Sequence, residues 1–202
     1  NADELDTCTD VDGGMSADPN RVHDAQIIHS LSYNEAMELA YFGAQFIHPQ
    51  TMGPVIDNAN AVVYRHSFEP DHPGSRISAV AALNGEIKGI TAIGGMALEN
   101  LEGAGMIGVP GTADRLFAAL KEAGVSVTLI SQASSEHSIC IAVPDDLAER
   151  AQNVIGEAFA DELDGGQIQS VDLTRGQSIV AVVGDGMAGH PGVAARFFAN
   201  LG

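Results

Sequence analysis

The chain has 202 residues, of which 45% are hydrophobic and 18% charged, a composition typical of a globular protein with one or two small cores. Its 27 acidic and 9 basic residues give a formal net charge of −18, which argues against nucleic acid as a partner because phosphate backbones are repelled. No apolar run approaches the roughly 20 residues of a membrane span, and no signal peptide is visible, so we expect a cytoplasmic protein without a membrane partner.

The first 84 residues alternate apolar, β-branched runs with helical patterns. Ser32 is followed three residues later by Glu35, the spacing of a capping box, which predicts the start of a helix. Thr9 and Asp10 lie where the first strand runs into a turn rich in Asp and Gly. Such a pair can bind the sugar or base of a nucleotide, or face a metal held by phosphates; the alternative is a simple Asx-turn. The predicted strands lie at 4–11, 61–64 and 75–80, and the predicted helices lie at 36–43 and 49–59.

From residue 85 the order of predicted elements becomes strand, helix, strand, strand, helix. This order is typical of a ferredoxin-like α+β module, with helices on one face of an antiparallel sheet. From Ile168 the pattern begins again. The predicted elements are two strand pieces within 87–101 around Gly94 and Gly95, a helix at 112–123, strands at 125–130 and 138–143, a helix at 144–163, a strand at 178–183 and a helix from 193 to 201.

Two glycine-rich segments, 103–111 and 184–192, share the pattern G-x-G-M-x-G-x-P-G, and we call them the first and the second corner. Agreement over this length indicates an internal repeat with an incomplete second unit. Glycines before a helix can expose backbone amides to a carboxylate or phosphate, or they can simply permit a tight turn with positive φ. Gln132 can donate and accept hydrogen bonds, as a site for a zwitterionic amino acid requires, or it can belong to a polar β-turn. The histidines and the two cysteines lack zinc-type spacing, so we expect no metal site formed by these side chains.

Together these segments resemble the aspartokinase family, with a leaning towards the bifunctional enzymes fused to homoserine dehydrogenase. The resemblance implies the carboxyl-terminal part of an amino-acid kinase fold at 1–84, a first ACT regulatory module at 85–166 and the start of a second, incomplete module at 167–202. The motifs that carry it are Thr9-Asp-Val-Asp-Gly, Met15-Ser-Ala-Asp-Pro, the helix at 31–44, Ile47-His-Pro, and the segments 68–74, 88–93, 105–112, 129–138 and 183–187.

The resemblance further implies ATP-dependent phosphorylation of the β-carboxylate of L-aspartate, with Mg²⁺, in the biosynthesis of lysine, threonine and methionine. Feedback inhibition by threonine or lysine would act through the ACT modules, which commonly pair in a homo-oligomer. NADP is implied only if a dehydrogenase follows. The family's Lys-Phe-Gly-Gly segment and Gly-Ser-Asp loop are absent from this sequence, so we expect no catalytic residue in it and no activity by itself. The alternative is a non-catalytic, ACT-containing regulatory subunit that binds an amino acid; the kinase-like residues 9–49 favour the enzyme.

Two sets of site residues are carried over from the family by position. Asn20 and Gln45 stand where the family usually has Arg and Lys, so positive charge is missing where phosphate would lie, and Arg21 is a candidate to compensate for Asn20. In the effector site, the helix start is expected to receive the carboxylate of the amino acid. The predicted nucleotide-binding residues are Thr9, Asp10, Met15, Asn20 and Gln45. The predicted effector-binding residues are Gly108, Gly111, Ala113, Val125 and Gln132.

Overall fold

The computed structural model describes residues 4–43, 49–69, 71–82, 85–132 and 137–202. The chain divides into two compact units, one formed by residues 1–92 and 180–202 and the other by residues 93–179. The two longest strands, β5 (Gly89–Glu102) and β8 (Ser170–Val183), each contribute residues to both units. The module boundaries expected from the sequence, after residues 84 and 166, stay predictions.

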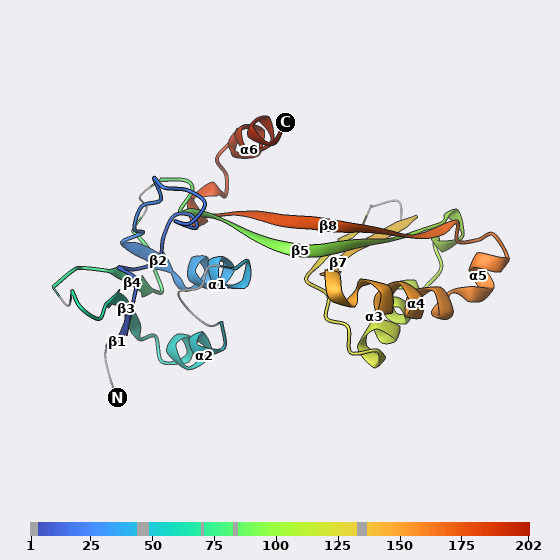
Figure 1. Ribbon diagram of the computed structural model, residues 1–202, viewed down its shortest axis with the longest axis horizontal. Helices are drawn as coiled ribbons and strands as arrows, with labels where there is room; N and C mark the ends of the chain where they lie inside the picture. The colour runs from blue at the N-terminus through green and yellow to red at the C-terminus, as the bar shows by residue number, and fades with distance from the viewer. Residues whose placement is uncertain (1–3, 44–48, 70, 83–84, 133–136) are drawn as a thin grey trace. The chain divides into compact units, whose positions relative to one another are not determined.

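The first unit contains a mixed sheet with the strand order β1-β3-β4-β2 (Figure 1). β1 (Glu4–Thr9) runs parallel to β3 (Ala61–His66), and β3 is antiparallel to β4 (Ser75–Ser78). β4 in turn runs parallel to β2 (Ser30–Ser32). Parallel pairing places the carboxyl ends of β1 and β3 at the same edge, which is the edge where ligands bind in open α/β sheets.

Two helices pack on this unit, α1 (Tyr33–Tyr41) and α2 (Pro49–Asp57). The predicted capping box is confirmed: the Glu35 amide donates to Ser32 Oγ at 3.0 Å, and the Ser32 amide donates to Glu35 Oε2 at 2.9 Å. A buried core that includes Leu31, Leu39 and Ile77 holds the unit together, and Val183 from the end of β8 joins it. The second corner follows β8 with the short helix η3 (Asp185–Met187) and leads into α6 (Val193–Leu201).

The second unit is the expected ferredoxin-like module. Its sheet has the order β6-β7-β5-β8, with β7 (Ser138–Pro144) antiparallel to both β5 and β6 (Leu129–Gln132). Core residues of β5 and β7 pack together with core residues of the helices. The remaining elements are η1 (Ala104–Met106), α3 (Thr112–Glu122), η2 (Asp145–Leu147), α4 (Ala148–Ala158) and α5 (Ala160–Asp164).

Four predicted elements differ in detail, and the first is the strand expected at 125–130, which is observed as β6 at Leu129–Gln132. The two strand pieces expected around Gly95 form one strand, because Gly95 adopts a φ of +69° without ending β5. The helix expected at 144–163 is interrupted at the fully buried Phe159, which has a φ of −117° and ends α4. β8 begins at Ser170 rather than at residue 178, and β2 was not predicted. None of the helices in the described ranges is long and apolar enough to cross a membrane.

Candidate functional site

The first corner is a turn in which most of the backbone amides donate to carbonyl oxygens. The Met106 amide donates to the Gly103 carbonyl at 3.1 Å, and the Val109 amide donates to the Met106 carbonyl at 3.1 Å. The Gly105 amide donates to the Gln167 carbonyl at 2.9 Å, so the corner is also fixed to the chain before β8. At Gly103 a Cβ atom would lie 2.5 Å from that same carbonyl oxygen, which leaves no room for a side chain. These amides are therefore not available to a ligand.

The opening of α3 has the features of an anion site. Gly111 is the N-cap residue, with a φ of +90° that favours glycine, and no side chain caps the helix. The first amides of an α-helix have no partner within the helix and lie at the positive end of its dipole. A glycine N-cap offers them no side-chain oxygen. A carboxylate is the natural partner for this helix start.

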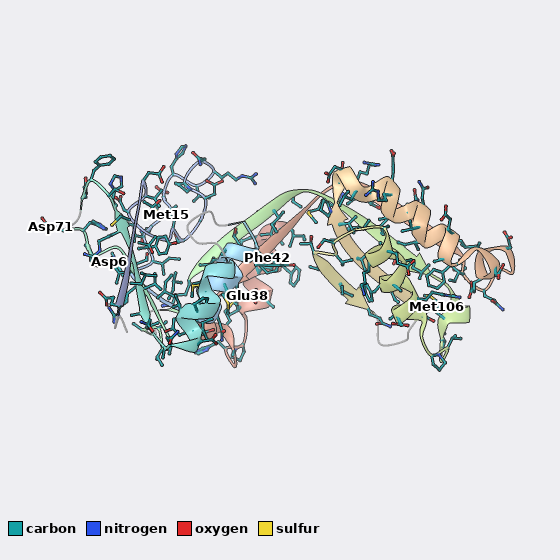
Figure 2. All side chains as sticks on the ribbon, turned by 90° about the horizontal axis from the view of Figure 1, so that it is seen from below. Asp6, Met15, Glu38, Phe42, Asp71 and Met106 are labelled. Atoms are coloured by element: carbon teal, nitrogen blue, oxygen red, sulfur yellow. The ribbon has the colours of Figure 1, made fainter. Side chains whose placement is uncertain are left out.

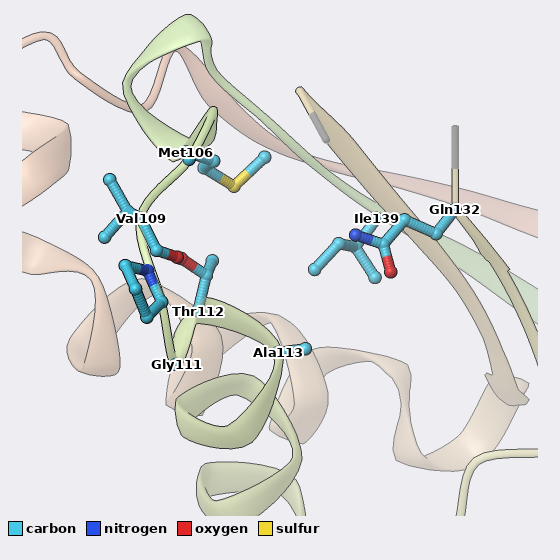
Figure 3. Close-up of a pocket in the computed structure, with 9 residues that line it drawn as sticks. Met106, Val109, Gly111, Thr112, Ala113, Gln132 and Ile139 are labelled. Atoms are coloured by element: carbon cyan, nitrogen blue, oxygen red, sulfur yellow. The ribbon is translucent and has the colours of Figure 1, made fainter. Parts of the chain in front are cut away.

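A pocket of about 330 Å³ lies beside this helix opening. Gln132 extends from β6 towards the space in front of α3, and Met106 and Ile139, both buried, contribute apolar surface (Figure 3). The described lining holds no charged side chain, so the helix start is its electrostatic feature. The lining residues are Met106, Gly108, Val109, Pro110, Gly111, Thr112, Ala113, Gln132 and Ile139.

Four of the five predicted effector residues lie in this lining, and Val125 is the exception. Val125 is 5% exposed and packs in the hydrophobic core of the unit. Ile139 and Thr112 also line the pocket, although neither is among the predicted effector-binding residues. Ile139 belongs to an alternating strand, which places it on the same face as the buried Ile141, and Thr112 follows the glycine cap directly. Both patterns can be recognised in the sequence. Neither pattern predicts a pocket, because the pocket also depends on residues from other elements that come close only in the fold.

The nearest arginine along α3, Arg115, is occupied elsewhere. It forms an ion pair with Glu162 of α5, and its guanidinium lies 4.2 Å from the centre of the Phe159 ring. The hydrogen bond from Arg115 lowers the pKa of the Glu162 carboxyl. Arg115 therefore contributes to packing between α3 and α5, and it is not among the pocket residues.

The predicted nucleotide residues lie at the carboxyl end of β1 and in the loop that follows. Thr9 ends the strand, and its hydroxyl donates to the exposed Asp10 carboxylate at 3.1 Å. Met15, which is labelled in Figure 2, lies in this loop. It forms an isolated antiparallel bridge with Ile27, which joins the two ends of segment 15–27. Among the described residues no group of three or more His, Cys, Asp or Glu side chains is placed to hold a metal. The role of Thr9 and Asp10 in nucleotide binding stays a prediction.

The loop folds around Asp18. The backbone and side-chain nitrogens of Asn20 both donate to Asp18 Oδ1, at 2.9 and 3.1 Å, which is an Asx-type turn. Arg21 pairs with Asp18 at 3.7 Å on the surface. Arg21, the candidate to compensate for Asn20, thus already has an acidic partner in this structure. Gln45 lies outside the described residues.

The second corner repeats the conformation of the first in different surroundings. Gly189 and Gly192 have φ values of +79° and +94°, close to those of Gly108 and Gly111. A pocket of about 290 Å³ lies beside this corner, and its lining includes Glu38 of α1 and Phe42, the residue that follows α1. Here the Asp185 amide donates to Glu35 Oε1 at 2.8 Å.

Comparison with known proteins covers nearly the whole chain. The amino acid kinase family model matches residues 1–64, and the ACT domain model matches residues 100–159. A bifunctional aspartokinase/homoserine dehydrogenase of Haemophilus influenzae is 45% identical over 194 residues, which are 96% of this chain and 24% of that protein. A bifunctional aspartokinase/homoserine dehydrogenase 1, chloroplastic, of Arabidopsis thaliana is 43% identical over 204 residues, with 98% and 22% covered. The chain thus spans about a quarter of the length of these relatives.

Solved structures agree with the family models. The aspartate kinase of Clostridium acetobutylicum superposes with a TM-score of 0.87 at 27% sequence identity, over 99% of this chain and 46% of that protein. Aspartokinase III of E. coli, in complex with aspartate and ADP, superposes with a TM-score of 0.80 over 99% of this chain and 44% of that protein. At 24% identity the latter match concerns the fold alone.

Proposed function

Because this chain belongs to the aspartokinase family, we propose that the full-length protein is an aspartate kinase that is inhibited by an end-product amino acid bound at the first corner. The reaction is the transfer of a phosphoryl group from ATP to the β-carboxylate of L-aspartate. In phosphoryl transfer the protein contributes mainly positioning and neutralisation of the developing charge. The chain spans about a quarter of its bifunctional relatives, so the activity is a property of the whole protein.

The observation that carries the regulatory half of the proposal is the uncapped start of α3 beside Gln132. The helix amides would hold the carboxylate of a free amino acid, and the Gln132 amide would bind a polar group of the same ligand. Met106 and Ile139 offer a short apolar wall. Threonine and lysine are both candidates, and the uncharged lining favours the neutral side chain of threonine, because a buried ammonium needs a partner.

The kinase half of the proposal rests on the matched residues 1–64 and on the loop after β1. Thr9 and Asp10 would line the nucleotide site, with Met15 and Asn20 in the loop beyond them. ATP would enter with Mg²⁺ held through its phosphates, and NADP would be used only by a homoserine dehydrogenase region. We also propose the cytoplasm as the location and a homo-oligomer paired through ACT modules. The match to a kinase model makes an enzyme a better proposal than a separate regulatory subunit.

Isothermal titration of the 202-residue chain with threonine, lysine and methionine tests the sensing function. We expect one of them to bind, and we expect Gln132→Ala to weaken that binding about tenfold, since a net hydrogen bond contributes about 1–1.5 kcal/mol. Gln169→Ala is the matched control, because Gln169 is an exposed glutamine of the same unit outside the pocket. A folded chain that binds none of the amino acids would refute the sensing function.

The catalytic function is tested separately in the full-length protein. We expect ADP release from ATP and Mg²⁺ to depend on L-aspartate, and the effector found by titration to inhibit it. ADP release that is independent of aspartate would refute the kinase assignment without affecting the binding result. Unchanged inhibition in the full-length Gln132→Ala variant would remove Gln132 from the effector site.

A further inference from the structure

The carboxylate of Glu35 joins two segments that lie 150 residues apart. Glu35 is 2% exposed, and each of its oxygens accepts one backbone amide: Oε2 that of Ser32 at 2.9 Å, and Oε1 that of Asp185 at 2.8 Å. Hydrogen bonds to an ionised, buried acceptor are stronger than neutral ones. The carboxylate therefore closes the capping box of α1 and fixes the start of the second corner at the same time.

The start of β5 makes a second set of connections in the same unit. The Lys88 amide donates to the Val183 carbonyl at 2.8 Å, directly before the second corner. The Ile90 amide donates to the Ser16 carbonyl at 2.8 Å, within the predicted nucleotide loop. The Thr91 hydroxyl donates to the Phe42 carbonyl at 2.7 Å, at the end of α1.

The contact between strand and loop is close as well as hydrogen-bonded. A Cβ atom on Gly89 would lie 3.2 Å from the Ser16 carbonyl oxygen and 3.0 Å from Leu39 Cδ2. A displacement of the strand by a few tenths of an ångström would therefore also displace the loop, since packed interiors transmit small shifts. Segment 88–91 thus lies in contact with the loop on one side and is bonded to the residue before the second corner on the other.

We infer that Glu35 and segment 88–91 form a clamp that couples the second corner to the nucleotide loop, so that releasing the corner weakens nucleotide binding. The inference rests on the proposed role of the loop after β1. Glu35 acts here as a positioning residue, because it holds the corner and α1 while the loop contacts the nucleotide. By linkage, nucleotide binding would stabilise the clamped corner to the same extent.

Asp185→Pro is a selective perturbation of the clamp. Proline removes the amide that donates to Glu35, and it suits position 185 because that residue opens η3 and Gly184 before it is extended, with φ 167° and ψ 123°. Asp185→Ala is the matched control, because it retains the amide and removes only an exposed side chain. Alanine also occupies the equivalent position in the first corner, at Ala104.

The two variants are compared in the full-length protein by amide hydrogen exchange and by equilibrium binding of ATP with Mg²⁺. We expect Asp185→Pro to speed exchange of the Ile90 amide by about tenfold or more and to weaken nucleotide binding by a similar factor. Asp185→Ala should leave both unchanged. Unchanged Ile90 exchange in the proline variant would overturn the clamp, as would equal effects in both variants. Faster exchange with unchanged nucleotide affinity would overturn the coupling.

A second pair of variants tests the clamp even if the Asp185→Pro variant does not fold. Thr91→Val removes the hydroxyl that donates to Phe42, whereas Thr91→Ser retains it. Only the valine variant should speed Ile90 exchange and weaken nucleotide binding, and equal behaviour of the two variants would count against the clamp. If the parent protein binds no ATP, the proposed kinase function fails, while the exchange measurement still decides whether the clamp exists.

Discussion

Glu99 is a buried carboxylate on β5, and we expect it to make the stability of the second unit depend on pH. It is 1% exposed, and neither of its oxygens has a hydrogen-bond partner among the described residues. It lies between Ala97 and Leu101, two core residues on the same side of the strand. Burial raises the pKa of the Glu99 carboxyl from 4.5 to about 7, although the nearby Arg175 guanidinium acts in the opposite direction.

The sign of the effect follows from the raised pKa. Between pH 4.5 and about pH 7 the folded state holds a proton at Glu99 that the unfolded state has lost, so stability falls as pH rises through this window. Below pH 4.5 the Glu99 carboxyl is neutral in both the folded and the unfolded state. Above about pH 7 it is ionised in both states, and the folded state then carries the whole energetic cost of burying the charge. A pKa change from 4.5 to about 7 corresponds to about 3 kcal/mol of unfolding free energy.

Urea unfolding of the parent and of Glu99→Gln, followed by circular dichroism between about pH 5 and about pH 8, measures this cost. Gln has nearly the same shape and stays neutral, so the two stabilities should approach each other at the acid end, and the variant should be more stable by about 3 kcal/mol at the alkaline end. Subtracting the unfolding free energy of the parent from that of the variant removes the contribution of all other carboxylates, because these titrate alike in both proteins. Glu102→Gln, which removes one charge from a less buried position on the same strand, is the control. A stability difference that does not change with pH would refute the reasoning.

Two further predictions concern local structure and use the same unfolding measurement. Ser32→Ala removes the hydroxyl that caps α1 and should cost about 1 kcal/mol; an unchanged free energy of unfolding would contradict the role of the cap. Gly103→Ala should cost more than about 2 kcal/mol, because its Cβ would lie 2.5 Å from the Gln167 carbonyl oxygen. Its control is Gly156→Ala in the last turn of α4, where a Cβ atom would meet nothing within 4 Å and the variant should gain up to about 0.5–1 kcal/mol. Equal effects of the two alanines would show that the corner tolerates a side chain.

Local signals in the sequence predicted much of the fold. The capping box at Ser32 and Glu35 was readable because its residues are three positions apart. The second bond of Glu35, to the Asp185 amide, joins residues 150 positions apart and has no local pattern. β8 was predicted too short, although Val171 and Leu173 pack against the core and alternate with the exposed Asp172 and Thr174. Gly176, with a φ of +69°, interrupts this alternation in the sequence without ending the strand.

The candidate pocket was predictable to the extent that it follows the corner motif. Gly108 and Gly111 have the positive φ that the repeated glycines indicated, and Gln132 extends from a strand end as its position implied. Val125 could not be placed from the sequence. A valine at the start of a predicted strand has the same pattern whether it faces a pocket or the core, and here it belongs to the buried core cluster.

The two corners show why a repeated sequence does not by itself repeat a site. Both end in an uncapped helix after a left-handed glycine, so the helix starts are equivalent. Around the first corner, β6 and β7 bring Gln132 and Ile139 to the helix opening, and a pocket without charged lining results. The second corner lies instead against α1, where Glu35 binds the Asp185 amide and Glu38 adds a carboxylate to the lining. An anionic ligand is attracted to the first arrangement and repelled by the second. The same backbone turn therefore suits binding of an anionic ligand in one unit and attachment to α1 in the other.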